Sequence, residues 1–343
     1  MKTSLRIFKI FGIPIELDFS FLILIISIYL LAFSGFISLE MAVLITLIFV
    51  TVVIHELSHS YVALHFGVKI EKILLLPIGG IAKMEEIPRV PRQELLISIA
   101  GPLTNLIIAA AFYGIQSTRI FPQTITNFIG NFILVNIVLA LFNLIPAFPM
   151  DGGRILRALL AEKMTYLRST EVAANLGKFL AILMAMARIF YNFFLILIAL
   201  FIYIGAEQEY RLVFISSLLE GVKVGDVMTP EPITLKPSST VSEALETVFK
   251  YKHMGYPVTE NDELKGIVTF QDLSNAEKDA PISEVMTKNV ITVDINDDAI
   301  LALEKLTSHD LGRLPVLKDN KLVGIISKTD LIRTLDIMRR TKM

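Results

Sequence analysis

The sequence predicts a multi-pass α-helical membrane domain of about six transmembrane helices, followed by a smaller soluble α/β domain. Of the 343 residues, 54% are hydrophobic and only 19% are charged, whereas a typical soluble domain carries about 25% charged residues. The charge is also spread unevenly, with 29 charged residues in 1–212 and 36 in 213–343. These observations predict a membrane domain at 1–210, a linker at 211–221 and a soluble domain after it.

The composition excludes several classes of protein and of site. Lys and Arg number 32 against 33 Asp and Glu, which argues against a nucleic-acid binder driven by net charge. The chain has no cysteine, so disulfides, thiolate catalysis and zinc sites built from Cys are excluded. Any metal must therefore be held by His, Asp or Glu.

Each transmembrane helix needs about 20 largely apolar residues. Six segments meet this requirement: 18–36, 41–64, 93–115, 128–148, 171–188 and 190–207. A tight turn around Arg188–Asn192 separates the last two segments. The N-terminus lacks a signal-peptide cleavage pattern, so the first segment is expected to stay in the protein. Six spans place both termini on the same side of the membrane.

The distribution of basic residues predicts which side that is. Cytoplasmic loops carry an excess of Lys and Arg. On the side of the termini lie Lys2, Arg6, Lys9, Lys69, Lys72, Lys83, Arg89, Arg92, Arg154, Arg157, Lys163 and Arg168. The opposite loops offer little more than Arg119 and Arg188. We therefore expect a multi-pass protein of the cell membrane with both termini and the soluble domain in the cytoplasm.

One apolar stretch, Val68–Met84, is too short to cross a membrane. Pro77 and the pair Gly79-Gly80 interrupt it and indicate a turn. We predict a β-hairpin at the cytoplasmic surface of the membrane. It is either an ordinary interfacial loop or an edge strand that pairs with an extended substrate.

The second apolar segment contains His55-Glu56-Leu57-Ser58-His59. On a helix, His55 and His59 share a face, so both imidazoles can bind one Zn²⁺, and Glu56 is placed to take a proton from water. An Asp, Lys or Arg in hydrocarbon costs about 2.5–3.5 kcal/mol, so three titratable groups in one turn of such a segment need compensation. A hydrogen-bonded pair of core histidines is the simpler alternative. We expect His65 to lie at the cytoplasmic end and not to bind metal.

Two histidines leave room for a third protein ligand, and Asp151 is the best candidate. Pro146 and Pro149 break the helix before it, and Gly152-Gly153 allows a close approach of the backbone. Irregular backbone at membrane depth is tolerated only when it is buried in protein or lines a wet cavity. An ordinary Asp-Gly-Gly turn is the alternative interpretation.

Together these residues resemble the site-2 protease family of intramembrane zinc metalloproteases, and the resemblance covers 1–210. It is carried by His55-Glu56-x-x-His59 and by Asn143-x-x-Pro-x-x-Pro-x-Asp151-Gly. It is closest to archaeal-type members with six spans and a cytoplasmic pair of CBS domains. The resemblance implies that His55, His59 and Asp151 bind one Zn²⁺ per chain and that Glu56 is the general base. It also implies that Asn143 orients the peptide or stabilises the oxyanion, although capping of the broken helix is an alternative.

The same resemblance implies regulated intramembrane proteolysis, in which a transmembrane segment of another membrane protein is cut. The substrate must then unwind or extend, because a peptide bond inside a helix is blocked by its own hydrogen bonds. Ala100–Asn105 also looks like a recurring segment of the family, in which Gly101 lets helices pack closely. We assign Asn105 no chemical role.

The soluble domain contains an internal repeat with an offset of 58 residues and no gap. The equivalent pairs are Met228 and Met286, Pro257 and Pro315, Gly266 and Gly324, and Asp272 and Asp330. The copies are expected at 222–276 and 280–337. Each copy reads as a short strand, a helix, two strands and a second helix, with the first helices at Val241–Tyr251 and Asp298–Ser308. Copies of this size rarely bury a core alone, so they are expected to pair.

The repeat resembles a tandem CBS pair, the Bateman module, through its Gly-h-h-[Ser/Thr]-x-x-Asp pattern, where h is hydrophobic. The resemblance implies a cleft for an adenine nucleotide, ATP or AMP, and a homodimer formed through the CBS domains. The residues implied for the nucleotide are Thr269, Asp272, Ser327 and Asp330, with Arg313 as an extra cation for phosphate. A module that binds nothing and only dimerises is the alternative. His253 and His309 are expected at the surface.

A metal-ion transporter or channel gated by CBS domains is the competing function. Such a transit site has no need of Glu56 beside two ligands, and an internal repeat of the membrane half is not visible. The intact metal motif likewise argues against an inactive scaffold.

Overall fold

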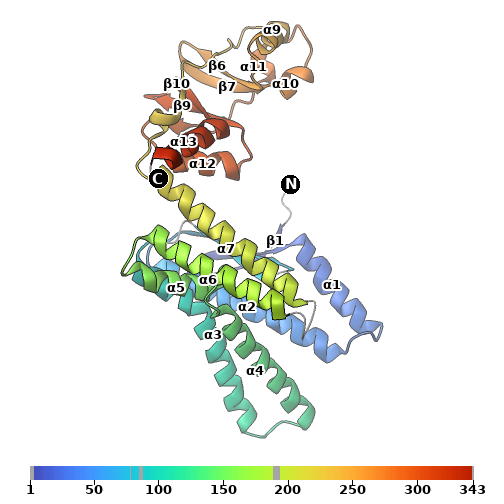
Figure 1. Cartoon of the computed structure of the whole chain (residues 1–343). Helices are drawn as coiled ribbons and strands as arrows, with labels where there is room; N and C mark the ends of the chain where they lie inside the picture. Colours follow the sequence, from blue (N-terminus) through green and yellow to red (C-terminus); the bar gives the residue numbers. More distant parts are fainter. Residues whose placement is uncertain (1–3, 78, 85–87, 188–193, 342–343) are drawn as a thin grey trace. The chain divides into compact units, whose positions relative to one another are not determined.

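The computed structural model describes residues 4–77, 79–84, 88–187 and 194–341 (Figure 1). The chain divides into two compact units, Met1–Val213 and Phe214–Met343. The predicted turn around Arg188–Asn192 lies outside the described residues.

The first unit is mainly helical. Its helices are α1 (Phe19–Phe33), α2 (Leu39–His65), α3 (Pro91–Ser117), α4 (Gln123–Asn143), α5 (Asp151–Ala161), α6 (Tyr166–Ala187) and α7 (Phe194–Leu219). The six predicted segments fall on α1, α2, α3, α4, α6 and α7, whereas the short helix α5 is an addition. Helix α7 ends at Leu219, so residues 211–219 of the predicted linker are helical.

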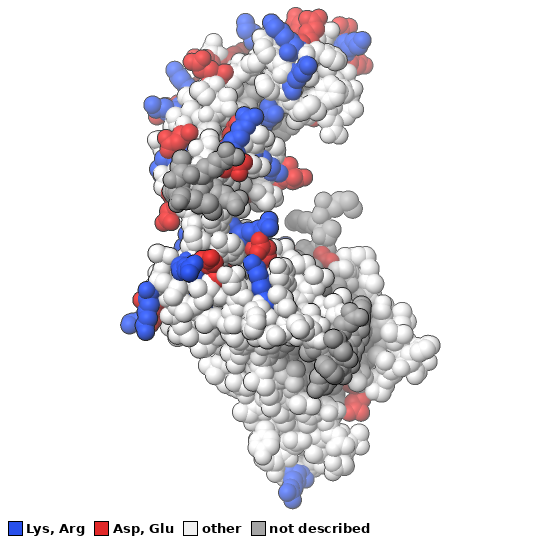
Figure 2. All heavy atoms as spheres, in the orientation of Figure 1, with Lys and Arg blue, Asp and Glu red and all other residues white. Residues whose placement is uncertain are grey.

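Three of the described helices, α2, α3 and α4, are long and apolar enough to cross a membrane. Helix α1 is apolar but has only 15 residues. Helices α6 and α7 are long, but each carries charged side chains, such as Lys178 in α6 and Glu207 in α7. The number of six spans therefore stays a prediction. In the view of Figure 2, coloured charges are sparse on the first unit and dense on the second.

A four-stranded sheet accompanies these helices. Its strands are β1 (Ser4–Ile10), β2 (Ile13–Asp18), β3 (Ile70–Leu76) and β4 (Gly79–Met84), in the order β1-β2-β3-β4. The pairs β1–β2 and β3–β4 are antiparallel and β2–β3 is parallel. The predicted hairpin in Val68–Met84 is confirmed. The N-terminal hairpin was not predicted, and it turns through Phe11 and Gly12, both at positive φ, as a two-residue hairpin turn requires.

The second unit is an α/β domain made of two similar halves. Its helices are α8 (Val224–Val227), α9 (Val241–Tyr251), α10 (Phe270–Ser274), α11 (Ile282–Val285), α12 (Ala299–Ser308) and α13 (Lys328–Thr341). Its strands are β5 (Thr229–Pro230), β6 (Gly255–Glu260), β7 (Glu263–Thr269), β8 (Val293–Asp294), β9 (Arg313–Lys318) and β10 (Lys321–Ser327). The main sheet has the order β6-β7-β10-β9-β8, with β5 on β10. The predicted helix–strand–strand–helix order of each copy is confirmed.

The two copies exchange their first segments. Met228 of the first copy packs on Gly324 of the second, where an added Cβ would lie 2.4 Å from its Sδ. Met286 of the second copy packs in the same way on Gly266 of the first, at 2.6 Å. The predicted pairing of the copies is therefore built on reciprocal contacts between equivalent residues.

Candidate metal centre

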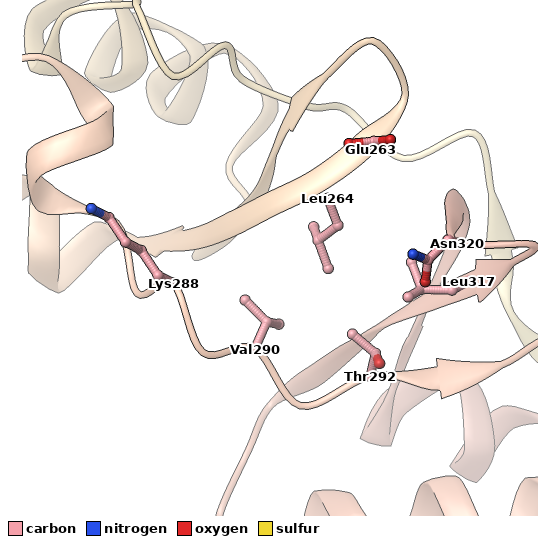
Figure 3. Close-up of a pocket in the computed structure, with 7 residues that line it drawn as sticks. All are labelled: Glu263, Leu264, Lys288, Val290, Thr292, Leu317 and Asn320. Atoms are coloured by element: carbon pink, nitrogen blue, oxygen red, sulfur yellow. The ribbon is translucent and has the colours of Figure 1, made fainter.

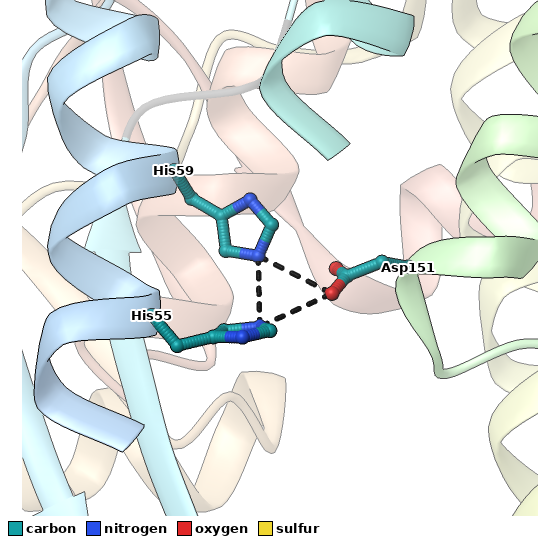
Figure 4. A group of neighbouring side chains, drawn as sticks. All are labelled: His55, His59 and Asp151. Atoms are coloured by element: carbon teal, nitrogen blue, oxygen red, sulfur yellow. Dashed lines mark hydrogen bonds and ion pairs between the residues drawn. The ribbon is translucent and has the colours of Figure 1, made fainter. Parts of the chain in front are cut away.

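Two histidines and one aspartate meet inside the first unit (Figure 4). His55 and His59 lie four residues apart on α2, and Asp151 is the first residue of α5. The Nε2 atoms of the two histidines are 3.0 Å apart, and Asp151 Oδ2 lies 3.2 Å from His55 Nε2 and 3.3 Å from His59 Nε2. Ligand atoms bound at about 2.0–2.1 Å around a tetrahedral zinc ion are separated by about 3.3 Å. The spacing therefore fits a single metal ion.

The outer nitrogens of both imidazoles have partners on α3. The Nδ1 of His59 donates a hydrogen bond to the carbonyl oxygen of Ile97 at 2.6 Å, and the Nδ1 of His55 donates to Asn105 Oδ1 at 3.3 Å. In neutral imidazoles this leaves both Nε2 lone pairs directed toward Asp151. A single metal ion between these three atoms would satisfy all of them at once. The donor set therefore fits zinc.

Helix α3 can approach the imidazoles this closely because residue 101 is glycine. A Cβ at Gly101 would lie 2.2 Å from His59 Nε2 and 2.5 Å from His55 Nε2. Any side chain there would collide with both imidazole rings. The predicted role of Gly101 in close packing is thus borne out at the metal centre itself. Asn105, to which we assigned no role, holds the ring of His55.

Asp151 reaches the histidines because α4 stops early. The helix ends at Asn143, and a non-helical segment with Pro146 and Pro149 runs to the start of α5. Residues Gly152 and Gly153 pack tightly on that segment: a Cβ at Gly152 would lie 2.2 Å from the carbonyl oxygen of Ile145. The predicted helix break and the inward turn of Asp151 are both present.

Glu56 lies beside His55 on α2 and is partly buried. Strand β4 packs against it, because a Cβ at Gly80 would lie 2.8 Å from Glu56 Cγ and 3.1 Å from Val52 Cγ1. The candidate general base therefore lies next to an edge strand of the sheet. This contact was not predicted, because only the tertiary fold brings Gly80 and Glu56 together.

Asn143 is not one of the three residues that meet at the metal centre. Its Nδ2 donates a hydrogen bond to the carbonyl oxygen of Leu139 at 3.0 Å, within the last turn of α4. His65 ends α2 with an exposed ring. The hydrogen bond of Asn143 and the exposed position of His65 assign no chemistry to either residue.

Four of the five residues proposed for a nucleotide form helix caps in the second unit. The Asp272 carboxylate accepts hydrogen bonds from the backbone N–H and the hydroxyl of Thr269, at 2.8 and 2.7 Å. Asp330 accepts the equivalent bonds from Ser327, at 2.9 and 2.6 Å. Each pair is a capping box that starts a helix, which explains the shared spacing without a ligand.

Arg313 belongs to the second copy but contacts the first. Its Nη1 donates to the carbonyl oxygen of Gly255 at 3.1 Å. A Cβ at Gly255 would lie 3.8 Å from Thr269 Cγ2 and 4.0 Å from Arg313 Cδ. Thr269 and Arg313, which are distant in sequence, therefore lie at the same place.

A separate open cavity of about 240 Å³ lies in the second unit (Figure 3). Its lining residues come from both copies: Glu263, Leu264, Lys288, Val290, Thr292, Leu317 and Asn320. None of the five residues proposed for the nucleotide is among them.

Comparison with known proteins agrees with this division. The model of peptidase family M50 matches residues 43–122 and 114–186, and the CBS domain model matches 224–279 and 282–337. The zinc metalloprotease MJ0392 of Methanocaldococcus jannaschii is 44% identical over 341 residues, which cover 98% of each chain. Stage IV sporulation protein FB of Bacillus subtilis is 30% identical over 40% of this chain and 47% of its own.

Among solved structures, the site-2 protease from Methanocaldococcus jannaschii is 48% identical and covers 61% of this chain and 95% of that chain, with a TM-score of 0.46. The similarity to MJ0392 extends over both units and includes the metal motif region. The chain therefore belongs to peptidase family M50, the site-2 proteases, and is an intramembrane zinc metalloprotease with a pair of CBS domains.

Proposed function

We propose that His55, His59 and Asp151 hold the zinc ion of this protease and that Glu56 is its general base. The observation that carries the proposal is the triangle of 3.0, 3.2 and 3.3 Å between the three ligand atoms. When bound, zinc would polarise the scissile carbonyl and lower the pKa of a water molecule, so that this water can lose a proton and attack near neutral pH. Glu56 takes the proton from the attacking water at a carboxylate oxygen and passes it to the nitrogen of the leaving amine.

The substrate is a peptide bond within or near a transmembrane segment of another membrane protein. It binds in an extended form along β4, which is at the edge of the sheet. Edge strands bind extended peptides through backbone hydrogen bonds. The contact of Gly80 with Glu56 supports this placement, because Gly80 belongs to the edge strand and Glu56 is the proposed base.

Asn143 orients the peptide or stabilises the oxyanion in this proposal. Loss of one donor to an oxyanion lowers kcat by about 10²–10³-fold. Asn143→Ala should therefore lower kcat while zinc content stays unchanged. If turnover is unchanged and only the melting temperature falls, the bond to Leu139 is its whole contribution.

The proposal is tested with purified protein in detergent and a transmembrane substrate. Cleavage should require zinc, Glu56→Gln should bind zinc without cleaving, and His55→Ala should lose zinc. Full cleavage by Glu56→Gln with intact zinc would remove the role of Glu56. Movement of zinc across proteoliposomes without cleavage would favour the transporter.

We further propose that both termini and the CBS pair are cytoplasmic, as the excess of Lys and Arg on that side predicts. The chain has no cysteine, so single substitutions give a clean labelling test. A cysteine at exposed Lys288 should react with a membrane-impermeant thiol reagent only in opened cells, and one at exposed Arg119 should react in intact cells. The reverse pattern would invert the topology.

For the CBS pair we propose binding of an adenine nucleotide, ATP or AMP, regulation of cleavage and homodimerisation. The proposed domain boundaries are 1–210 for the membrane domain, 211–221 for the linker, 222–276 for the first CBS copy and 280–337 for the second. The meeting of Arg313 with Thr269 supports a phosphate site between the copies. Calorimetry with ATP and AMP should show binding to the wild type and weaker binding to Arg313→Gln. Absence of binding to the wild type would leave a module that only dimerises.

A further inference from the structure

Arg157 is a buried cation that joins three helices of the first unit. It lies on α5, six residues after Asp151, and is 3% exposed. Its Nε and Nη2 donate to Glu94 Oε1 on α3, at 2.8 and 2.5 Å, and its Nη1 donates to Glu209 Oε1 on α7 at 2.8 Å. The sequence placed Arg157 among the basic residues of a loop, but its guanidinium is inside the protein.

Two aromatic rings fix the guanidinium. Its Cζ lies 4.9 Å from the ring centroid of Phe148 and 4.8 Å from that of Tyr166. Burial raises the pKa of Tyr166 to about 12, so this ring stays neutral beside the cation. Phe148 is fully buried and precedes Asp151 by three residues. Arg157 therefore contacts both the segment before Asp151 and, through its own helix, the segment after it.

This arrangement is costly as a source of stability alone. One guanidinium faces two carboxylates, and Glu94 is 0% exposed. The second carboxylate oxygen of Glu94 is buried and has no hydrogen-bond partner among the described residues. Buried ion pairs are often no more stable than apolar residues of similar volume, and their best-attested use is to select one arrangement.

Arg157 contacts α3 through Glu94, and α3 is also the helix that orients the two histidines. On α3, Glu94 is followed at one-turn intervals by Ile97, whose carbonyl holds His59, then by Gly101, and then by Asn105, which holds His55. Helix α7 adds a second contact, since a Cβ at Gly205 would lie 2.6 Å from Pro149 Cδ, two residues before Asp151.

We propose that Arg157 is a positioning residue, which with Glu94 and Glu209 fixes Asp151 relative to His55 and His59. The inference rests on the proposed metal role of these three residues. Helix α3 holds both imidazoles through hydrogen bonds. The pairing of Glu94 with Arg157 also ties α5, which carries Asp151, to α3, so that one helix positions all three ligands. Loss of the pairing lets α5 shift and separates the aspartate from the histidines.

The readout is metal affinity rather than cleavage. Zinc affinity is measured by chelator competition, and the geometry of the site by the visible absorption of the Co²⁺-loaded protein. Arg157→Lys keeps the charge but not the paired donors, and should raise the zinc Kd about 10–100-fold, as is usual when residues that orient metal ligands are changed. The double variant Glu94→Gln/Arg157→Met removes both buried charges and should show the same loss.

Helix α7 provides a matched pair of controls. Glu209→Gln weakens the contact with Arg157 and should raise the zinc Kd and shift the Co²⁺ spectrum. Glu207 lies two residues earlier and pairs with Lys178 and Arg211, away from α5, so Glu207→Gln should leave both readouts unchanged. Equal effects of the two substitutions would reduce Arg157 to a general structural role.

The outcomes separate this inference from the proposed function. If His55→Ala binds zinc as tightly as the wild type, the metal site itself is wrong. If His55→Ala loses zinc while the Arg157 variants and Glu209→Gln keep wild-type Kd and spectrum, only the positioning role is refuted. Where the double variant fails to fold, Arg157→Lys and Glu209→Gln decide the question.

Discussion

Replacement of Gly101 by alanine tests the geometry of the metal centre directly. The added methyl would lie 2.2 Å from His59 Nε2 and 2.5 Å from His55 Nε2, whereas carbon atoms in contact need about 3.5–4.0 Å. Either α3 or the imidazoles must therefore move by about 1 Å or more. Metal–ligand distances tolerate only about 0.2 Å, and a 1 Å misplacement at a reacting centre costs about 10²-fold in rate.

The measurement is zinc content together with turnover of a transmembrane substrate in detergent. Gly101→Ala should lose most of its zinc and at least about 10²-fold of its activity. Gly114→Ala on the same helix is the control, because an added Cβ there meets no atom of the described residues within 4 Å. Alanine also stabilises a helix interior by about 1 kcal/mol relative to glycine. Full zinc occupancy and normal turnover of Gly101→Ala would refute the reasoning.

Further predictions concern the neighbours of the site and the sheet. Gly80→Ala should displace Glu56, 2.8 Å from the new Cβ, and lower kcat while zinc content stays normal; unchanged kcat would contradict the contact. Asn105→Leu removes the acceptor for the first histidine and should weaken zinc binding about 10–100-fold in a chelator titration, with an unaltered Kd as the contrary result. A hydrogen bond from Lys72 and a second one from Ser4 hold the pKa of Glu16 below its ordinary value. The carboxylate is therefore stabilising above its ordinary pKa and this contribution is lost as the pH falls through the lowered value. Wild type should melt above Glu16→Gln at pH 7, and the gap should close on acidification; a constant gap would assign it to packing.

Local patterns were sufficient for several elements. The spacing of His55 and His59 follows from the helical period. The prolines before Asp151 marked the break in the helix, although α4 ends at Asn143 and not at residue 148 as the predicted segment did. Pro77 and Gly79 likewise marked the hairpin of β3 and β4. In each case the signal lies within one turn or one loop, so no distant partner is needed to interpret it.

The rest depends on contacts between distant residues. Strand β2 pairs in parallel with β3, more than fifty residues away, so the partner that makes it a strand cannot be found in its own sequence. Arg157 was interpreted as a basic residue of a loop, because its buried ion-pair partner Glu94 lies 63 residues earlier in the sequence. Asn105 looked inert because its partner His55 lies on another helix.

The exchange of Met228 and Met286 between the two CBS copies has a consequence for how this domain can be divided. If the chain is cut between the copies, each half loses the methionine that packs on its glycine, Gly266 or Gly324. The cut also exposes the sheet edge where β7 and β10 pair. Neither half is then a self-sufficient folding unit. The two copies should unfold in one cooperative transition, and a ligand that binds to either copy should raise the melting temperature of both.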